Sequence, residues 1–189
     1  MNNRTTMLLL LLSLGTLLVA AVLTFIALGA GNPIPWILVA LAVAIPAFSN
    51  WREKRHFVTW NRDLSVGIEL IDEDHQKLFN LINQLHTAVY YYTGEAFEKQ
   101  ALDDLVAYTQ YHFQREEDLM EKHGYPEFEA HRKEHREMIA QVEQFLRDYE
   151  KRGHETLKEM ANYLKSWLIS HISDTDQRYS GFLREKGVR

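Results

Sequence analysis

Residues 111–135 read YHFQREEDLMEKHGYPEFEAHRKEH, a stretch that predicts the end of one helix, a turn and the start of another. His112 and Glu116 are four residues apart before the turn, and His131 and His135 are four residues apart after it. Side chains four apart lie one above the other on the same helix face. His131 and His135 can therefore bind one metal from adjacent turns, while His112 and Glu116 present a nitrogen and an oxygen side by side.

Glycine and proline predict where these two helices end and begin. Gly124 has the position of a residue that ends a helix, so the earlier helix is expected over about residues 95–122. Pro126 suits the first turn of the next helix, where a missing N–H does no harm. That helix is expected to continue to about residue 151, where Gly153 closes it.

Two further helices flank this pair. One begins near Asp72 and the other near Glu155, and each carries apolar residues at the spacings of a single helical face. These residues are Leu78, Leu81, Ile82, Leu85 and Val89 in the first, and Leu157, Met160, Leu164, Trp167, Leu168 and Ile172 in the last. With short loops and no strand candidate, the pattern predicts an all-α fold, an antiparallel up-down four-helix bundle.

The two flanking helices complete a set of candidate metal ligands. His75 stands near the start of the first, and His171 lies in the last with Asp176 five residues beyond it. A lone helical histidine is more often an exposed or core residue than a ligand, and the acidic neighbours of Glu116 (Glu117, Asp118 and Glu121) are interpreted as a solvated face. The joint occurrence favours a metal site, because burying so many polar groups without metal would cost several kcal/mol. The predicted ligands are His75, His112, Glu116, His131, His135, His171 and Asp176.

Composition excludes several other classes of site. The chain has no cysteine among its 189 residues, so disulfides, thiolate zinc sites, iron–sulfur clusters and cysteine nucleophiles are ruled out. Its net charge of −5 is carried by the part beyond residue 50, which gives no basic face for nucleic acid. Nine histidines are the distinctive feature.

The first fifty residues differ in composition from the rest, since residues 7–48 contain no charged side chain. Residues 7–30 form an apolar run that would reach roughly 36 Å as a helix, against about 30 Å for a bilayer core. A turn follows, and residues 34–51 are apolar again, with Trp36 and Trp51 as interfacial anchors at the two ends. A signal peptide for the first segment, and a re-entrant or interfacial helix for the second, are the alternatives.

Positive charges at both ends of this region predict its orientation. Arg4 precedes the first segment, and Arg52, Lys54 and Arg55 follow the second. If both segments span, both ends lie in the cytoplasm. Residues 1–52 are thus predicted to be a membrane anchor of two hydrophobic helices in a bilayer, a transmembrane helical hairpin. Residues 60–185 are predicted to be the four-helix bundle, facing the cytoplasm at the inner membrane of a bacterium.

Three motifs resemble those of the hemerythrin family, in particular its bacteriohemerythrin-type domains. They are residues 65–68 (SVGI) with 71–76 (IDEDHQ) and 78–79 (LF), then residues 111–117 (YHFQREE) with Met120, 124–126 (GYP), His131 and His135, then Trp167, His171, Ile172, Asp176 and Tyr179. The similarity covers about residues 60–183, and all seven ligand positions are filled. The apolar region in front is the departure, because the best-known family members are soluble.

The resemblance implies a centre of two non-haem iron ions (Fe2+/Fe3+), bridged by Glu116, Asp176 and a solvent-derived oxygen. It implies that His131, His135 and His171 complete the coordination of one iron. His75 and His112 supply only two nitrogens to the other iron, which leaves an open position for dioxygen. The residues that match the family's apolar oxygen pocket are Leu78, Phe113, Trp167, Ile172 and Tyr179. Manganese or zinc stays open as an alternative metal, since imidazole and carboxylate ligands accept several.

The expected function is reversible dioxygen binding for oxygen storage or delivery at the membrane, without enzymatic turnover. A membrane oxidase or oxygenase is then the expected partner. Two alternatives remain: a membrane-bound sensor of dioxygen, nitric oxide or redox state, and a di-iron enzyme such as a peroxidase or nitric oxide reductase. The carboxylate-rich Glu-x-x-His pattern of ferritin-like oxidases is not found among the candidate ligands, which disfavours an oxidase.

Overall fold

The computed structural model describes residues 3–54, 57–91 and 93–189, with side chains described for residues 8, 11–48, 57–91 and 93–189. The chain divides into two compact units, Met1–His56 and Phe57–Arg189. Arg55, one of the charges used to predict orientation, lies outside the described residues. The same holds for the side chains of Arg4, Trp51, Arg52 and Lys54.

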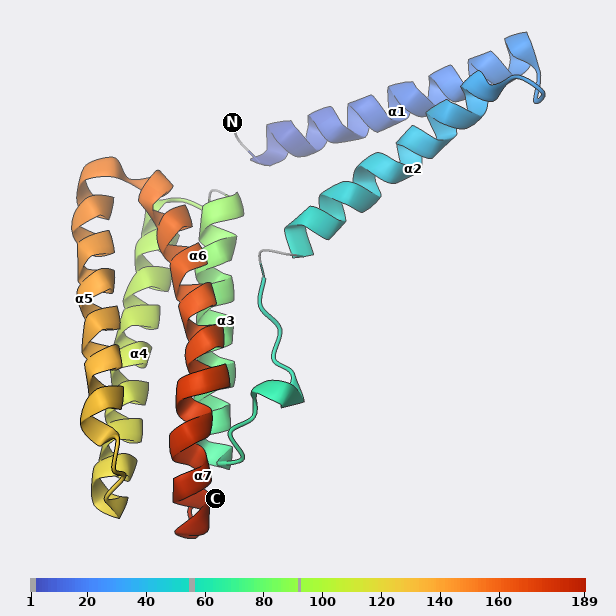
Figure 1. The fold of residues 1–189 in the computed structure, drawn as a ribbon. Helices are drawn as coiled ribbons and strands as arrows, with labels where there is room; N and C mark the ends of the chain where they lie inside the picture. The colour runs from blue at the N-terminus through green and yellow to red at the C-terminus, as the bar shows by residue number, and fades with distance from the viewer. Residues whose placement is uncertain (1–2, 55–56, 92) are drawn as a thin grey trace. The chain divides into compact units, whose positions relative to one another are not determined.

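The first unit is a pair of helices, α1 (Asn3–Leu28) and α2 (Pro33–Lys54), joined by a short turn (Figure 1). The Trp36 indole donates a hydrogen bond to the carbonyl of Ala30 at 3.0 Å, and its ring meets Phe25 edge-on. Within the described residues, one helix is long and apolar enough to cross a membrane, with residues 11–28 at a mean hydropathy of 2.5. The apolar stretch of α2, Pro33–Phe48, is shorter than that criterion requires, so a two-span hairpin is not established.

The second unit is an all-helical, antiparallel up-down bundle, as the apolar spacing predicts (Figure 1). Its helices are α3 (Glu69–Tyr91), α4 (Glu95–His123), α5 (Phe128–Arg152) and α6 (His154–His171), which continues through the π-helical segment η2 (Ile172–Asp176) into α7 (Gln177–Glu185). A 3-10 turn, η1 (Arg62–Leu64), precedes α3. No strand occurs in the described ranges. Apolar side chains from every helix form one core.

The turn between α4 and α5 agrees with the sequence prediction at one end and differs at the other. Gly124 is left-handed, with φ of 70°, and Tyr125 N–H donates to the carbonyl of Met120, so α4 ends as predicted. Pro126 lies in the turn and not in the first turn of α5, which begins at Phe128. The N–H of Phe128 bonds back to the carbonyl of Tyr125, which delays the start of the helix.

A glycine in the loop before α3 tests how closely that loop packs against α7. Gly67 has φ of +71°, and a Cβ there would lie 2.8 Å from Nη1 of Arg184. Gly67→Ala is therefore expected to lower the free energy of unfolding by about 1–2 kcal/mol, measured by chemical denaturation. Gly181→Ala is the matched control: it lies in α7 with nothing within 4 Å, so it should be neutral or stabilising. Equal stability of the two variants would contradict this account.

Candidate metal centre

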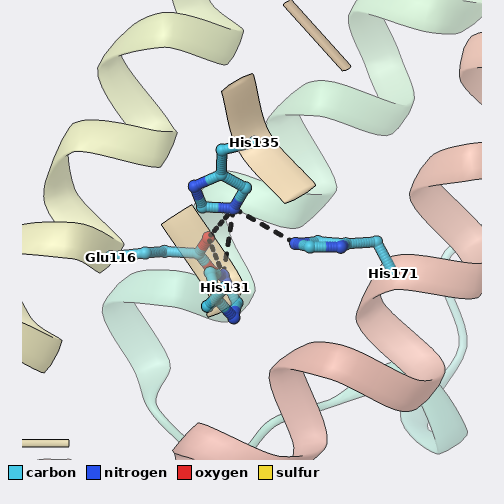
Figure 2. Close-up of side chains that lie close together, drawn as sticks. All are labelled: Glu116, His131, His135 and His171. Carbon is cyan, nitrogen blue, oxygen red and sulfur yellow. Dashed lines mark hydrogen bonds and ion pairs between the residues drawn. The ribbon is translucent and has the colours of Figure 1, made fainter. Parts of the chain in front are cut away.

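Two groups of potential metal ligands lie buried in the middle of the bundle. In the first, Glu116, His131, His135 and His171 offer ligand atoms within 4.8 Å of one another. Figure 2 shows these four side chains close together. In the second, His75 and His112 come together with the same Glu116. The two groups therefore share one carboxylate, and the predicted ligands from α3, α4, α5 and α6 meet at one level of the bundle.

The nitrogens of the first group are spaced as ligands of one ion would be. Nε2 of His135 is 3.0 Å from Nε2 of His131 and 3.1 Å from Nε2 of His171. Two nitrogens at right angles about an ion, each about 2.1 Å from it, would stand about 3.0 Å apart. His131 and His135 reach this geometry because they lie one turn apart on α5, and His171 approaches from α6.

The two oxygens of Glu116 face different groups. Oε1 is 3.7 Å from Nε2 of His75 and 3.6 Å from Nε2 of His112. Oε2 is 3.7 Å from Nε2 of His131 and 3.3 Å from Nε2 of His135. A carboxylate divided in this way can bind two cations at once.

Asp176 divides its oxygens between the same two groups. Oδ2 is 3.3 Å from Nε2 of His75, whereas Oδ1 is 3.2 Å from Nε2 of His171 and 3.7 Å from Nε2 of His131. In a regular α-helix a residue five positions after His171 would point about 140° away from it. The π-helical segment η2 reduces this offset, because its hydrogen bonds join residues five apart and widen the turn; such segments often mark functional sites. The apolar spacing of the sequence does not predict it.

Several ligand atoms are buried without a hydrogen-bond partner, which is the test of whether a metal fits. Within the described part of the chain, these include Nε2 of His75 and of His112, Oε2 of Glu116, and both oxygens of Asp176. Buried polar groups are nearly always satisfied, since each unsatisfied one costs free energy. Cations placed between the two groups would satisfy all of these atoms, so the residues fit a metal centre.

The pKa values of the ligand side chains are also shifted by burial and by one another. Burial alone would lower the pKa of His75 and of His135, but nearby negative carboxylates, Glu116 among them, raise both to about 9. Burial lowers the pKa of His171 to about 4, which keeps its ring neutral and able to donate a lone pair. Burial would raise the pKa of Glu116, yet His112, His131 and His135 hold it well below its usual range. The carboxylate therefore stays ionised and able to bind a cation.

Three carboxylates that were not predicted as part of the site contact the outer ring nitrogens of the ligand histidines. Oδ2 of Asp74 is 3.5 Å from Nδ1 of His112, Oε1 of Glu117 is 3.0 Å from Nδ1 of His135, and Oε2 of Glu134 is 3.3 Å from Nδ1 of His171. Such outer carboxylates orient a ligating imidazole and fix its tautomer. The interpretation of Glu117 as part of a solvated face is wrong, because its side chain bonds a buried histidine of α5.

Three of the five predicted pocket residues line a cavity beside the centre. Leu78, Phe113 and Trp167 surround a cavity of about 10 Å³, the room that one water-sized molecule needs. The other lining residues are Ile82, Leu105, Thr109, Met138, Leu164 and Leu168. Thr109 is the one polar member, and its hydroxyl is bonded to the carbonyl of Leu105. The cavity is therefore dry in character.

The remaining two pocket candidates lie elsewhere. Ile172 and Tyr179 are fully buried but are not among the residues that line the cavity. The hydroxyl of Tyr179 donates a hydrogen bond to Oε1 of Glu116. Burial, together with the negative charges of Glu116 and Asp176, raises the pKa of Tyr179 well above its usual range. Tyr179 thus acts as a hydrogen-bond donor to a ligand and not as an apolar wall.

Comparison with known families agrees with this geometry. The family model for the Hemerythrin HHE cation binding domain matches residues 66–183. The chain belongs to the hemerythrin family. The match lies within the second unit and contains all seven predicted ligands.

Hemerythrin relatives are similar over the same region. The chain is 34% identical to a bacteriohemerythrin of Stenotrophomonas maltophilia over 123 residues, 65% of this chain and 79% of that protein. It is 34% identical to a bacteriohemerythrin of Pseudomonas aeruginosa (strain PAO1) over 127 residues, 67% of this chain and 82% of that protein. A solved structure of wild-type hemerythrin is 28% identical, with a TM-score of 0.57 over 67% of this chain and 97% of that one.

Proposed function

We propose that this protein binds dioxygen reversibly at a non-haem di-iron centre and so stores or delivers oxygen. The observation that carries the proposal is the division of Glu116 and Asp176, each of which turns one oxygen to each group of histidines. Relatives named bacteriohemerythrin, similar over the whole bundle, support the same reading.

The ligands divide unequally between two ions. His131, His135 and His171 would hold one iron, His75 and His112 the other, and Glu116 and Asp176 would bridge them. Because His75 and His112 would give the second iron one nitrogen fewer, a coordination position there would be open to an exogenous ligand. When bound, a ferrous pair supplies the two electrons that dioxygen takes up on binding.

The protein's own residues favour release of intact dioxygen over irreversible oxidation of the iron. Leu78, Phe113 and Trp167 keep water from the centre, since the cavity that they line is apolar and small. Phe113 stacks on His135 and Trp167 on His171, which fixes two ligand rings. The hydroxyl of Tyr179 donates a hydrogen bond to Glu116 and holds the shared carboxylate in place. These features suit binding without turnover, and so favour a carrier over an enzyme.

An optical oxygen titration of the full-length protein in detergent tests the proposal, after anaerobic reduction and with iron quantified. Two irons per chain and a visible absorption band that appears with oxygen and fades on its removal are expected. Rapid, irreversible oxidation would contradict oxygen carriage. Sustained consumption of peroxide or nitric oxide would indicate an enzyme, and redox-dependent association with a partner would indicate a sensor.

We also propose that α1 and α2 form a transmembrane hairpin in the inner membrane of a bacterium, so that the bundle faces the cytoplasm and supplies an oxidase or oxygenase there. Only 6% of residues 11–28, the apolar part of α1, are buried, and Ile26 is 78% exposed. So much exposed apolar surface is unfavourable in water and calls for lipid. The intact protein is expected in the membrane fraction, resistant to extraction by high salt. A mature chain that begins after residue 30 would instead identify a signal sequence.

A further inference from the structure

A buried carboxylate borders the second group of ligands. Asp74 precedes His75 in α3 and is 2% exposed. Its Oδ2 atom lies 3.5 Å from Nδ1 of His112 in α4. The other ring nitrogen of His112, Nε2, faces Glu116 at 3.6 Å. The imidazole of His112 therefore stands between an inner carboxylate at the metal centre and an outer one.

Two side chains of α4 hold Asp74 in this position. Nη1 of Arg115 donates to both carboxylate oxygens, at 2.9 and 2.8 Å, and the hydroxyl of Tyr108 donates to Oδ1 at 2.7 Å. Tyr108 lies one turn before His112 on the helix, and Arg115 lies one turn after it. The carboxylate thus cannot turn away from His112 without breaking charge-assisted hydrogen bonds in a largely buried site.

The other outer carboxylates serve the first group of ligands. Glu117 contacts His135 and Glu134 contacts His171, both at Nδ1, and their side chains are 16% and 42% exposed. Asp74 is the most buried of the three. Nδ1 of His75 and Nδ1 of His112 both lack a hydrogen-bond partner among the described residues, but Nδ1 of His112 has the carboxylate of Asp74 at 3.5 Å. Within the described part of the chain, Asp74 is therefore the one outer carboxylate at the imidazole rings of the second group.

We propose that Asp74 is a positioning residue for the metal that His75, His112 and Glu116 bind, which deepens the proposed function and rests on it. A neutral imidazole carries one proton, and a carboxylate at Nδ1 favours the tautomer with the proton on that nitrogen. The Nε2 lone pair is then free for the metal. Because 3.5 Å is longer than a normal N–H···O bond, Asp74 acts through its charge and fixed orientation.

Replacement of Asp74 with asparagine tests this role. In the full-length protein, Asp74→Asn is expected to weaken ferrous binding at the second position 10- to 100-fold and to leave the first position unchanged, measured by anaerobic titration against a chelator. Nitrogen NMR of the metal-free, full-length protein is the second readout: the wild type should show the His112 proton on Nδ1, and the variant a mixture of tautomers. Asp74→Glu should restore part of the affinity.

Two further variants make the outcome decisive. Tyr108→Phe removes one hydrogen bond to Asp74 without changing the core, so it should weaken the second position by a smaller factor in the same direction. Glu73→Gln, at an exposed neighbour of Asp74, should change nothing. Wild-type affinity and an unchanged tautomer in Asp74→Asn would overturn the proposal, and so would equal weakening of both positions.

Failure of this proposal differs from failure of the proposed function. A wild-type protein that binds two metals, but does not release dioxygen when its pressure falls, overturns oxygen carriage alone. A wild-type protein that binds no metal at His75, His112 and Glu116 overturns both proposals.

Discussion

Glu116→Ala is expected to remove both metal ions from the protein. Glu116 belongs to both groups of ligands, and each of its oxygens faces two histidines. Asp176 is the one other predicted ligand in contact with both groups. Loss of Glu116 therefore halves the carboxylate charge shared by the two positions. It also leaves the buried hydroxyl of Tyr179 without its acceptor. We expect iron to fall from two ions per chain to close to none, measured by elemental analysis after reconstitution.

The thermal transition should change with the metal. A metal present at about 1,000 times its dissociation constant adds about 4 kcal/mol to stability, so wild-type protein should lose this increment when a chelator is added. Glu116→Ala should show no further loss with chelator, because it has no metal to lose. Glu121→Ala, at an exposed position on the same helix, is the matched control and should keep both ions. Two ions per chain in Glu116→Ala would refute the assignment of Glu116 as a bridge.

The architecture of the bundle follows from spacing in the sequence, but one local feature does not. The apolar spacing predicts α3, and the glycine after α4 predicts where that helix ends; the structure confirms both. The π-helical turn at Ile172–Asp176 has no such signal, because it is a change in hydrogen-bond partner within an uninterrupted helix. The spacing of five between His171 and Asp176 is the one hint, since a regular helix would turn these side chains apart.

All seven candidate ligands were predicted from the sequence, but spacing indicates a contact only where both partners lie on one helix. The pairs His112 with Glu116 and His131 with His135 are visible at a spacing of four. The contact of Glu117 with His135 joins residues 18 apart, and that of Asp74 with Arg115 joins residues 41 apart. No periodicity relates such positions, because they meet only when the helices pack. Tyr179 was placed with the apolar pocket by the family resemblance, and its contact with Glu116, 63 positions away, has no signal in the spacing either.

Phe113→Ala is expected to lower the free energy of unfolding by about 3–5 kcal/mol, the usual result of removing a buried aromatic ring. Phe113 lies in α4 and is 5% exposed, stacked on His135 with ring centroids 3.7 Å apart. Its loss opens the dry cavity directly onto that ligand. Chemical denaturation of the metal-free protein isolates the packing effect from the effect on the metal.

The same variant separates packing from protection of the centre. Phe97 lies on the same helix but is 42% exposed, so Phe97→Ala should cost less than about 1 kcal/mol and leave oxygen binding unchanged. In Phe113→Ala the enlarged cavity admits water beside the ligands, and the oxygen-dependent absorption band should be lost irreversibly and faster than in the wild type. A loss in Phe113→Ala as small as that expected for Phe97→Ala would contradict the predicted packing effect. A large stability loss with an unchanged rate of oxidation would show that Phe113 packs the bundle without shielding the metal, and protection would then have to come from Leu78 of α3 and Trp167 of α6.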